Sequence, residues 1–241
     1  MKQQLLLALA LVTAPTVWAD SYNQNITAIF GGGNPNTGWA TDTGSGITLG
    51  LRGKNRHPAT STANVNGVYS FATGLIPPNN NRAVWNWEFS INSGTALLPA
   101  YDYYVGIDLD PSQGISYTYV NALTYWTDNS FGTAATLNGQ GAEAAPNNAA
   151  NSAALAAANS IAQQSQNLVF VGGNPLLDAT YNYELFAVAS GAGANGTRLT
   201  DVGITVVVGN GGSRVPDAGS TSMLLGAGLV GLAGLRRKLG V

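Results

Sequence analysis

Apolar and polar residues alternate with a period of two along much of this chain, and this alternation constrains its fold more than any other feature. In VWNWEFSIN, residues 84–92, the side chains of Trp85, Trp87, Phe89 and Ile91 fall on one face. Such alternation is typical of a strand with one buried and one solvated face. The segments DYYVGIDLD (102–110) and LTDVGITVVV (199–208) repeat it. The sequence therefore predicts an all-β domain.

Further short strands are predicted between clusters of Gly, Asn and Pro such as GGGNPNTG and PPNNN, which are typical of turns. Many short strands of this kind predict an antiparallel β-sandwich, which we place at residues 20–210. The additional strands are expected at residues 26–30, 47–52, 68–72, 115–125, 168–171 and 181–189.

Residues 142–166 depart from this pattern, because they consist mainly of Ala, Asn, Ser and Gln. Alanine has the highest helix propensity, so a short helix is predicted over residues 148–163, with Leu155 and Ile161 contacting the core. A low-complexity insert without regular structure is the alternative, since one Leu and one Ile bury little apolar area.

Composition excludes several classes of function. The chain has no Cys, which removes thiolate chemistry, and a single histidine, His57, which excludes a His-rich zinc site. Residues 20–214 contain six Lys and Arg against eleven Asp and Glu, a net charge of −5. Nucleic acid binding needs clustered cations, so no nucleic acid partner is expected. The basic run LRGKNR, residues 51–56, is interpreted as a solvated strand end.

The N-terminus has the pattern of a secretory signal peptide. Lys2 precedes an apolar stretch over residues 5–12, Pro15 follows it, and the sequence Val17-Trp18-Ala19 resembles a signal peptidase site. A buried N-terminal strand or helix is the alternative interpretation. We expect residues 1–19 to be removed between Ala19 and Asp20, so that the mature chain is exported.

The C-terminus carries a second apolar segment within residues 211–241. Residues 218–235 have no charge, and a helix of that length would measure about 27 Å, close to the hydrocarbon thickness of a bilayer. The cations Arg236, Arg237 and Lys238 follow at once, and the positive-inside rule would keep them in the cytoplasm. The glycine content of the segment predicts a weak, temporary anchor, and a plain C-terminal anchor is the alternative.

The polar residues before this span complete a recognisable arrangement: Val215, Pro216, Asp217, Gly219, Ser220 and Thr221. Motif, span and basic tail together resemble the PEP-CTERM sorting signal in its VPDxG variant. Segments of the body, such as GITLGLRGKNR and ATYNYELFAVA, resemble small sandwich-like members of the same group. The resemblance implies a Gram-negative exported protein that an exosortase processes at the inner membrane and delivers to the surface or to the polysaccharide of a biofilm matrix.

Candidate residues for catalysis are few. A Ser-His-Asp triad would have to use His57, which is predicted in a loop. Glu88 and Glu184 form the obvious carboxylate pair for glycoside hydrolysis. Each lies on the polar face of a predicted strand, where a solvated glutamate is the ordinary expectation. We therefore expect no enzymatic activity and no cofactor.

Two binding hypotheses stay open. Asp108 and Asp110, predicted on one side of a strand, together with Asp128 from a neighbouring loop, offer oxygen ligands of the kind that calcium prefers, although solvated turn acids are the simpler interpretation. Trp126 beside Thr127-Asp128-Asn129 is predicted to be exposed and to act as a sugar-stacking platform, which would suit an exopolysaccharide partner. Trp39, Trp85 and Trp87 are predicted to belong to the core.

Overall fold

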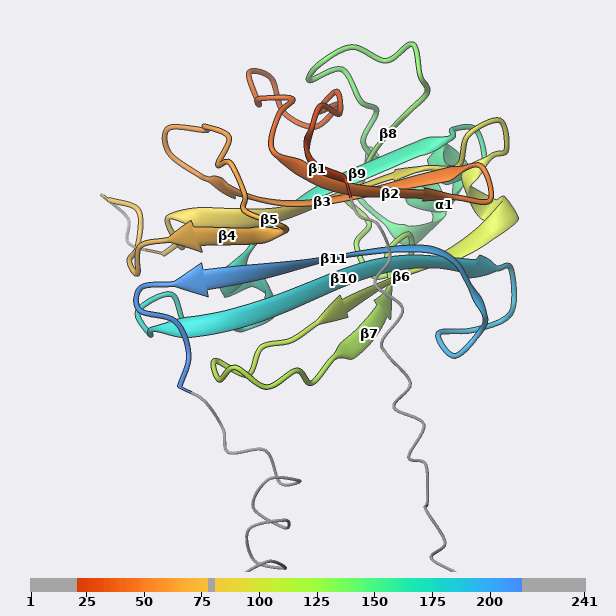
Figure 1. Ribbon diagram of the computed structural model, residues 1–241. Helices are drawn as coiled ribbons and strands as arrows, with labels where there is room; N and C mark the ends of the chain where they lie inside the picture. Colours follow the sequence, from red (N-terminus) through yellow and green to blue (C-terminus); the bar gives the residue numbers. More distant parts are fainter. Residues whose placement is uncertain (1–20, 78–80, 214–241) are drawn as a thin grey trace, which may run out of the picture.

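The computed structural model describes residues 21–77 and 81–213, which form two β-sheets packed face to face (Figure 1). The predicted all-β fold is confirmed. The elements in chain order are β1 (Ser21–Gln24), β2 (Trp39–Gly44), β3 (Ile47–Asn55), β4 (Val68–Phe71), β5 (Trp85–Asn92), η1 (Leu98–Ala100), β6 (Tyr101–Ile107), β7 (Thr118–Asn121), β8 (Ser130–Gly132), α1 (Ala149–Ala156), β9 (Ile161–Asn167), η2 (Leu168–Val171), β10 (Ala179–Ala189) and β11 (Arg198–Val208), where η1 and η2 are 3-10 helices.

The first sheet has the strand order β1-β2-β3-β5-β9-β8 and the second has the order β4-β11-β10-β6-β7. Pairing in the first sheet is antiparallel throughout. In the second sheet, however, β4 runs parallel to β11, with Thr205 opposite Val68. The prediction of a purely antiparallel sandwich is therefore wrong at this edge.

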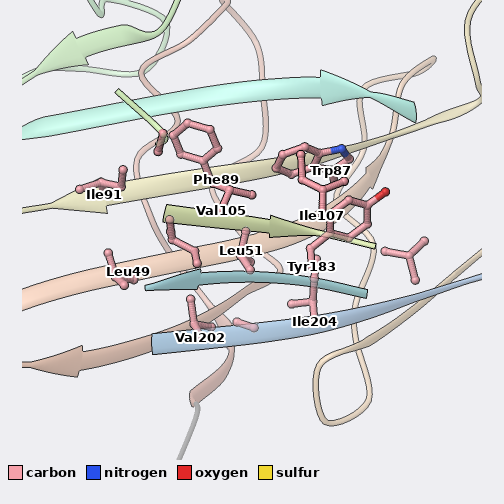
Figure 2. Close-up of a cluster of buried hydrophobic side chains, with 14 of the residues drawn as sticks. Leu49, Leu51, Trp87, Phe89, Ile91, Val105, Ile107, Tyr183, Val202 and Ile204 are labelled. Carbon is pink, nitrogen blue, oxygen red and sulfur yellow. The ribbon is translucent and has the colours of Figure 1, made fainter. Parts of the chain in front are cut away.

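The core lies between the sheets and is built by the alternating residues that the sequence marks (Figure 2). Trp87, Phe89 and Ile91 of β5 face Val105, Ile107, Tyr183, Val202 and Ile204 of the second sheet. Trp85 and Trp87 are fully buried, as predicted. Burial of this apolar surface is the main force that joins the two sheets.

The outer face of the first sheet is also buried, which the alternation does not predict. Asn86, Glu88 and Ser90 point away from the core, yet each is less than 5% exposed. Residues 25–38 lie across this face, and Ala28, Phe30 and Trp39 form a second, smaller apolar cluster there. Ile29 N donates to the Oε1 atom of Gln163 on β9 at 2.8 Å, which fixes the segment on the sheet. The predicted strand at residues 26–30 is thus an irregular covering segment.

The insert at residues 142–166 contains a helix that is shorter than predicted. Asn148 caps α1 by accepting from Asn151 N at 2.9 Å, and the helix ends at Ala156. Ile161 begins β9 instead of continuing the helix, because the backbone of β9 pairs with β5 on one side and β8 on the other. Pairing on both sides stabilises a strand whose Gln and Ser side chains have little intrinsic preference for one.

Two other predicted strands differ from the structure. Residues 168–171 form the 3-10 helix η2, since the side chain of Asn167 accepts from Val169 N and starts a turn. Of residues 115–125, only Thr118–Asn121 pair, with β6. Within residues 21–77 and 81–213, no helix has the length and apolar character needed to span a membrane. The predicted signal peptide, residues 1–19, and the predicted span, residues 218–235, lie outside the described residues.

Candidate functional site

The described domain ends directly before the predicted sorting motif. After β11, the Gly212 N–H donates to the Thr180 Oγ1 atom at 2.9 Å, and Gln113 N donates to the Ser213 carbonyl oxygen at 3.1 Å. A Cβ atom on Gly212 would lie 2.0 Å from the Pro111 carbonyl oxygen, so the chain passes in direct contact with the body here. The fold thus secures the backbone up to Ser213, two residues before Val215.

Trp126 is not an exposed platform. Its side chain is 8% exposed and packs on Trp87 and Phe89, with ring centroids 5.8 and 5.6 Å apart. The Asn129 side chain donates to the carbonyl oxygens of Ala122 and Trp126, each at 2.9 Å, which closes the loop and turns the ring inward. The prediction of exposure is wrong, because polarity of the following residues does not determine where a large ring packs. Trp39 is buried as predicted, but in the outer cluster.

The three calcium candidates do not form one site. Asp108 and Asp110 follow β6 in a turn and do not share a strand face: Asp108 is fully buried, and its Oδ1 accepts from Asp110 N at 3.1 Å. Asp128 instead accepts from the Gln164 Nε2 atom at 2.7 Å, on a strand of the other sheet. No group of three metal-ligating His, Cys, Asp or Glu side chains occurs in the described part of the chain.

Glu88 and Glu184 lie on opposite outer faces of the sandwich. Their chain neighbours Trp87 and Tyr183 point into the shared core, so the two carboxylates point away from it, one from each sheet. Sheets pack about 10 Å apart, and glycosidase carboxylates are separated by about 5–9.5 Å. The two residues are therefore too far apart to act as a hydrolytic pair. His57 lies in an exposed loop.

Glu184 belongs to an ion-pair group on the second sheet. Arg198 contacts Glu184 at 2.8 Å and Asp201 at 3.1 Å, and its guanidinium lies 4.1 Å from the Phe186 ring centre. Burial raises the pKa of Asp201, although the charge of Arg198 opposes this shift. The side chains of Arg198 and Glu184 are 32% and 13% exposed, so the group is a structural surface cluster.

Glu88 belongs to a second and more deeply buried charged group. Its Oε2 accepts from the Arg52 Nε atom at 2.7 Å, while its Oε1 lies 3.1 Å from the Lys54 Nζ atom and accepts from the Ser165 hydroxyl at 2.7 Å. Arg52 and Glu88 are fully buried and Lys54 is 4% exposed. The interpretation of residues 51–56 as a solvated strand end is wrong at these two cations, since residues 25–38 cover them.

A family model of the VPDSG-CTERM motif matches residues 214–239. The chain carries a VPDSG-CTERM sorting signal. It is a variant of the PEP-CTERM-like exosortase signals, as the resemblance of the sequence predicts, with Ala218 at the position of the serine in the name of the model. The signal indicates an exported protein that is sorted by an exosortase to the surface or the extracellular space.

The VPDSG-CTERM match begins at the residue that follows Ser213, so the signal and the described domain adjoin without a linker between them. The comparisons with curated proteins and with solved structures found no match. The assignment of the sorting signal consequently carries no activity over to the sandwich domain.

Among the cavities of the described domain, one of about 300 Å³ lies beside α1. Tyr101, Asp102, Thr124 and Thr127 contribute to its lining, and Ala153 of α1 closes one side. The Asp102 Oδ2 atom accepts from Gly191 N at 2.8 Å, and the Tyr101 ring stands edge-on to Tyr103 with centroids 6.3 Å apart. The sequence signal for this site is weak: an aromatic residue directly before an acid, Tyr101-Asp102, which alone does not predict a cavity.

Proposed function

We propose that this chain is a non-enzymatic surface or matrix protein of a Gram-negative bacterium, exported by a signal peptide that is cut between Ala19 and Asp20. The apolar segment 218–235 and the cations Arg236 to Lys238 hold it in the inner membrane for a short time. An exosortase then cuts beside Val215-Pro216-Asp217 and releases the domain toward the surface or the exopolysaccharide.

The proposal rests above all on the position of the sorting signal. Residues 214–239 follow a domain whose backbone is hydrogen-bonded up to Ser213, so cleavage in the motif leaves every described strand intact. Pro216 favours an extended backbone at the residue before it, the form in which processing enzymes generally bind their substrates. The sorting signal follows the domain with no residues between them, which supports a position of the folded domain close to the membrane face during processing.

A C-terminal epitope tag after Val241 tests the proposal. We expect the tag to be absent from the surface-released protein, and the double variant Pro216→Ala and Asp217→Ala to leave full-length protein in the inner membrane. Asp110→Ala with Pro111→Ala is the matched control, because it changes the same two residue types at an exposed turn of the body. Recovery of the intact tail on extracellular material from wild-type cells would show a plain anchor instead.

N-terminal sequencing of the released protein tests the other end, with Asp20 as the expected first residue. A released protein that starts at Met1 would contradict removal of residues 1–19.

An activity assay tests the proposal that the protein is non-enzymatic. The purified protein is expected to release no reducing sugar from the exopolysaccharide of the organism. Release of reducing sugar by the purified protein would show that the domain is a hydrolase.

Binding of a carbohydrate is the second candidate function, and the cavity beside α1 favours it. Sugar sites combine aromatic rings with short polar side chains, and this cavity is lined by Tyr101, Asp102, Thr124 and Thr127 as well as by apolar residues such as Leu123 and Ala153. We expect Tyr101→Ala to reduce retention on the exopolysaccharide, while Tyr125→Ala, at an exposed tyrosine outside the cavity lining, leaves it unchanged. Equal retention of both variants would remove the cavity from consideration.

A further inference from the structure

Lys54, Asn34 and Glu88 meet beneath the segment that covers the outer face of the first sheet. Lys54 lies on β3, Glu88 on β5, and Asn34 in the turn at residues 31–38. The Lys54 Nζ atom contacts the Oδ1 atom of the Asn34 amide and lies 3.1 Å from the Glu88 Oε1 atom. The Lys54 amine therefore contacts both a carboxamide and a carboxylate; Lys54 and Glu88 are buried, and Asn34 is half-buried at the edge of the cover.

The charges of this site do not balance. Arg52 and Lys54 contribute two positive charges, and within the described residues their only ion-pair partner is the single carboxylate of Glu88. An uncompensated buried charge is costly, because the protein interior cannot replace the hydration that the charge loses. Arg52 already forms the closest ion pair with Glu88, at 2.7 Å. Lys54 is thus the surplus cation.

The Asn34 side chain is oriented by the backbone around it. Its Nδ2 atom donates to the carbonyl oxygens of Phe30 and Gly31, each at 2.9 Å, so the amide oxygen is directed at Lys54. The Phe30 ring lies 5.9 Å from the Lys54 Nζ atom on another side. The fold therefore holds the Asn34 carboxamide against the Lys54 amine. Pre-orientation of two groups in this way supplies a large part of the barrier reduction when they react within one molecule.

We propose that Lys54 and Asn34 form an intramolecular isopeptide bond, with Glu88 as the proton-transfer residue. Glu88 takes a proton from the Lys54 ammonium, and the neutral amine attacks the Asn34 Cγ atom, forming the new C–N bond. The C–N bond to Nδ2 then breaks, and the departing nitrogen takes up protons from Glu88 and from the attacking amine. The products are a secondary amide, an ionised Glu88 and one ammonium ion.

This reaction removes the surplus charge. The amide nitrogen is neutral, the ammonium ion leaves for solvent, and the Arg52–Glu88 pair remains as a balanced ion pair. The bond fastens residues 31–38 to β3, in a chain that has no Cys and hence no disulfide. A covalent closure of the loop between residues 34 and 54 restricts the unfolded chain in the way that a disulfide does, which suits an exported protein.

Peptide mapping of the purified, denatured wild-type protein tests the bond directly. Trypsin does not cut after an acylated lysine, so the peptide that ends at Arg52 should be joined to residues 53–56 as one branched species. Its mass should be lower than the sum of the two peptides by one ammonia, about 17 Da. Cleavage after Lys54 and linear peptides of unchanged mass would overturn the proposal without recourse to any variant.

Variants separate the roles of the three side chains. Lys54→Arg and Asn34→Ser should each give only linear peptides, because one lacks the amine and the other the carboxamide. Glu88→Gln should leave the bond unformed, whereas Ser165→Ala, which removes hydrogen bonds to the same carboxylate oxygen and to Asn86 but keeps the carboxylate, should retain it. A branched peptide in Glu88→Gln would show that Glu88 does not transfer the proton.

Discussion

The indole of Trp87 stacks on the phenol ring of Tyr183 across the interface of the two sheets, with ring centroids 4.7 Å apart and planes inclined by 22°. Trp87 comes from β5 and Tyr183 from β10, so this pair joins the central strands of both layers. Both side chains are completely buried, with 0% of their surface exposed to solvent. The pair therefore reports on the packing of the whole sandwich.

The two members of this pair should respond differently to substitution. Trp87→Ala removes a large ring from the centre of the core and should lower the free energy of unfolding by about 3–5 kcal/mol. Tyr183→Phe keeps the ring and removes a hydroxyl that has no hydrogen-bond partner among the described residues, so stability should be unchanged or rise by about 1 kcal/mol. Urea unfolding measures both. A large loss in Tyr183→Phe would mean that its hydroxyl is satisfied.

Trp126→Ala should destabilise the domain by about 3 kcal/mol or more, because the side chain packs against Trp87 and Phe89. The adjacent Tyr125 is 60% exposed, so Tyr125→Ala should change the free energy of unfolding by about 0.5 kcal/mol or less. Thermal unfolding of the two variants provides the comparison. Equal and small effects of the two substitutions on stability would indicate that the Trp126 side chain is exposed.

The core strands are predictable from the sequence because period-two alternation reports directly on which face packs. β5, β6 and β11 appear where that pattern occurs, and their apolar residues form the core. Alternation reveals nothing about what covers the polar face. Glu88 and Arg52 were assigned to solvent because the cover at residues 25–38 is irregular and largely glycine-rich, and the strand predicted at residues 26–30 carries no signal of where it packs.

Strand β9 illustrates a second limit of the sequence. Its residues IAQQSQN lack both the apolar alternation and the β-branched content of a strand, and the alanines before them favour a helix. Pairing with β5 and β8 determines its conformation, and this information lies far away in the chain. The sorting signal was predictable for the opposite reason, since its motif, span and cations are adjacent in the sequence.

Asn167, at the end of β9, should be among the most sensitive polar residues. Its side chain accepts from Ala83 N at 2.9 Å and donates to the carbonyl oxygens of Ala83 and Trp85, each at 3.0 Å. Asn167→Ala leaves these buried backbone groups unpaired, so a loss of about 3 kcal/mol or more is expected in urea unfolding. Asn210→Ala, at an exposed turn, is the control with an expected change of about 0.5 kcal/mol or less.

Alkaline pH should destabilise the domain through its buried tyrosines. Burial raises the pKa of Tyr69, Tyr103 and Tyr183 above the ordinary value of 10.0. A phenol whose pKa is raised in the folded state contributes stability that is complete below pH 10 and is lost as the pH rises toward the folded value, because only the unfolded chain releases the proton. Stability should thus be level up to about pH 9 and fall above about pH 10.

Each such tyrosine should lower the free energy of unfolding by about 1.4 kcal/mol per pH unit in that range. Urea titrations at a series of pH values measure the slope, and ultraviolet difference absorbance of tyrosinate shows when the buried rings ionise. Tyr183→Phe should make the slope shallower, since it removes one of the tyrosines with a raised pKa while leaving its ring in place. Stability that stays level through pH 11, or a slope that the variant does not change, would show that these phenols ionise within the folded domain.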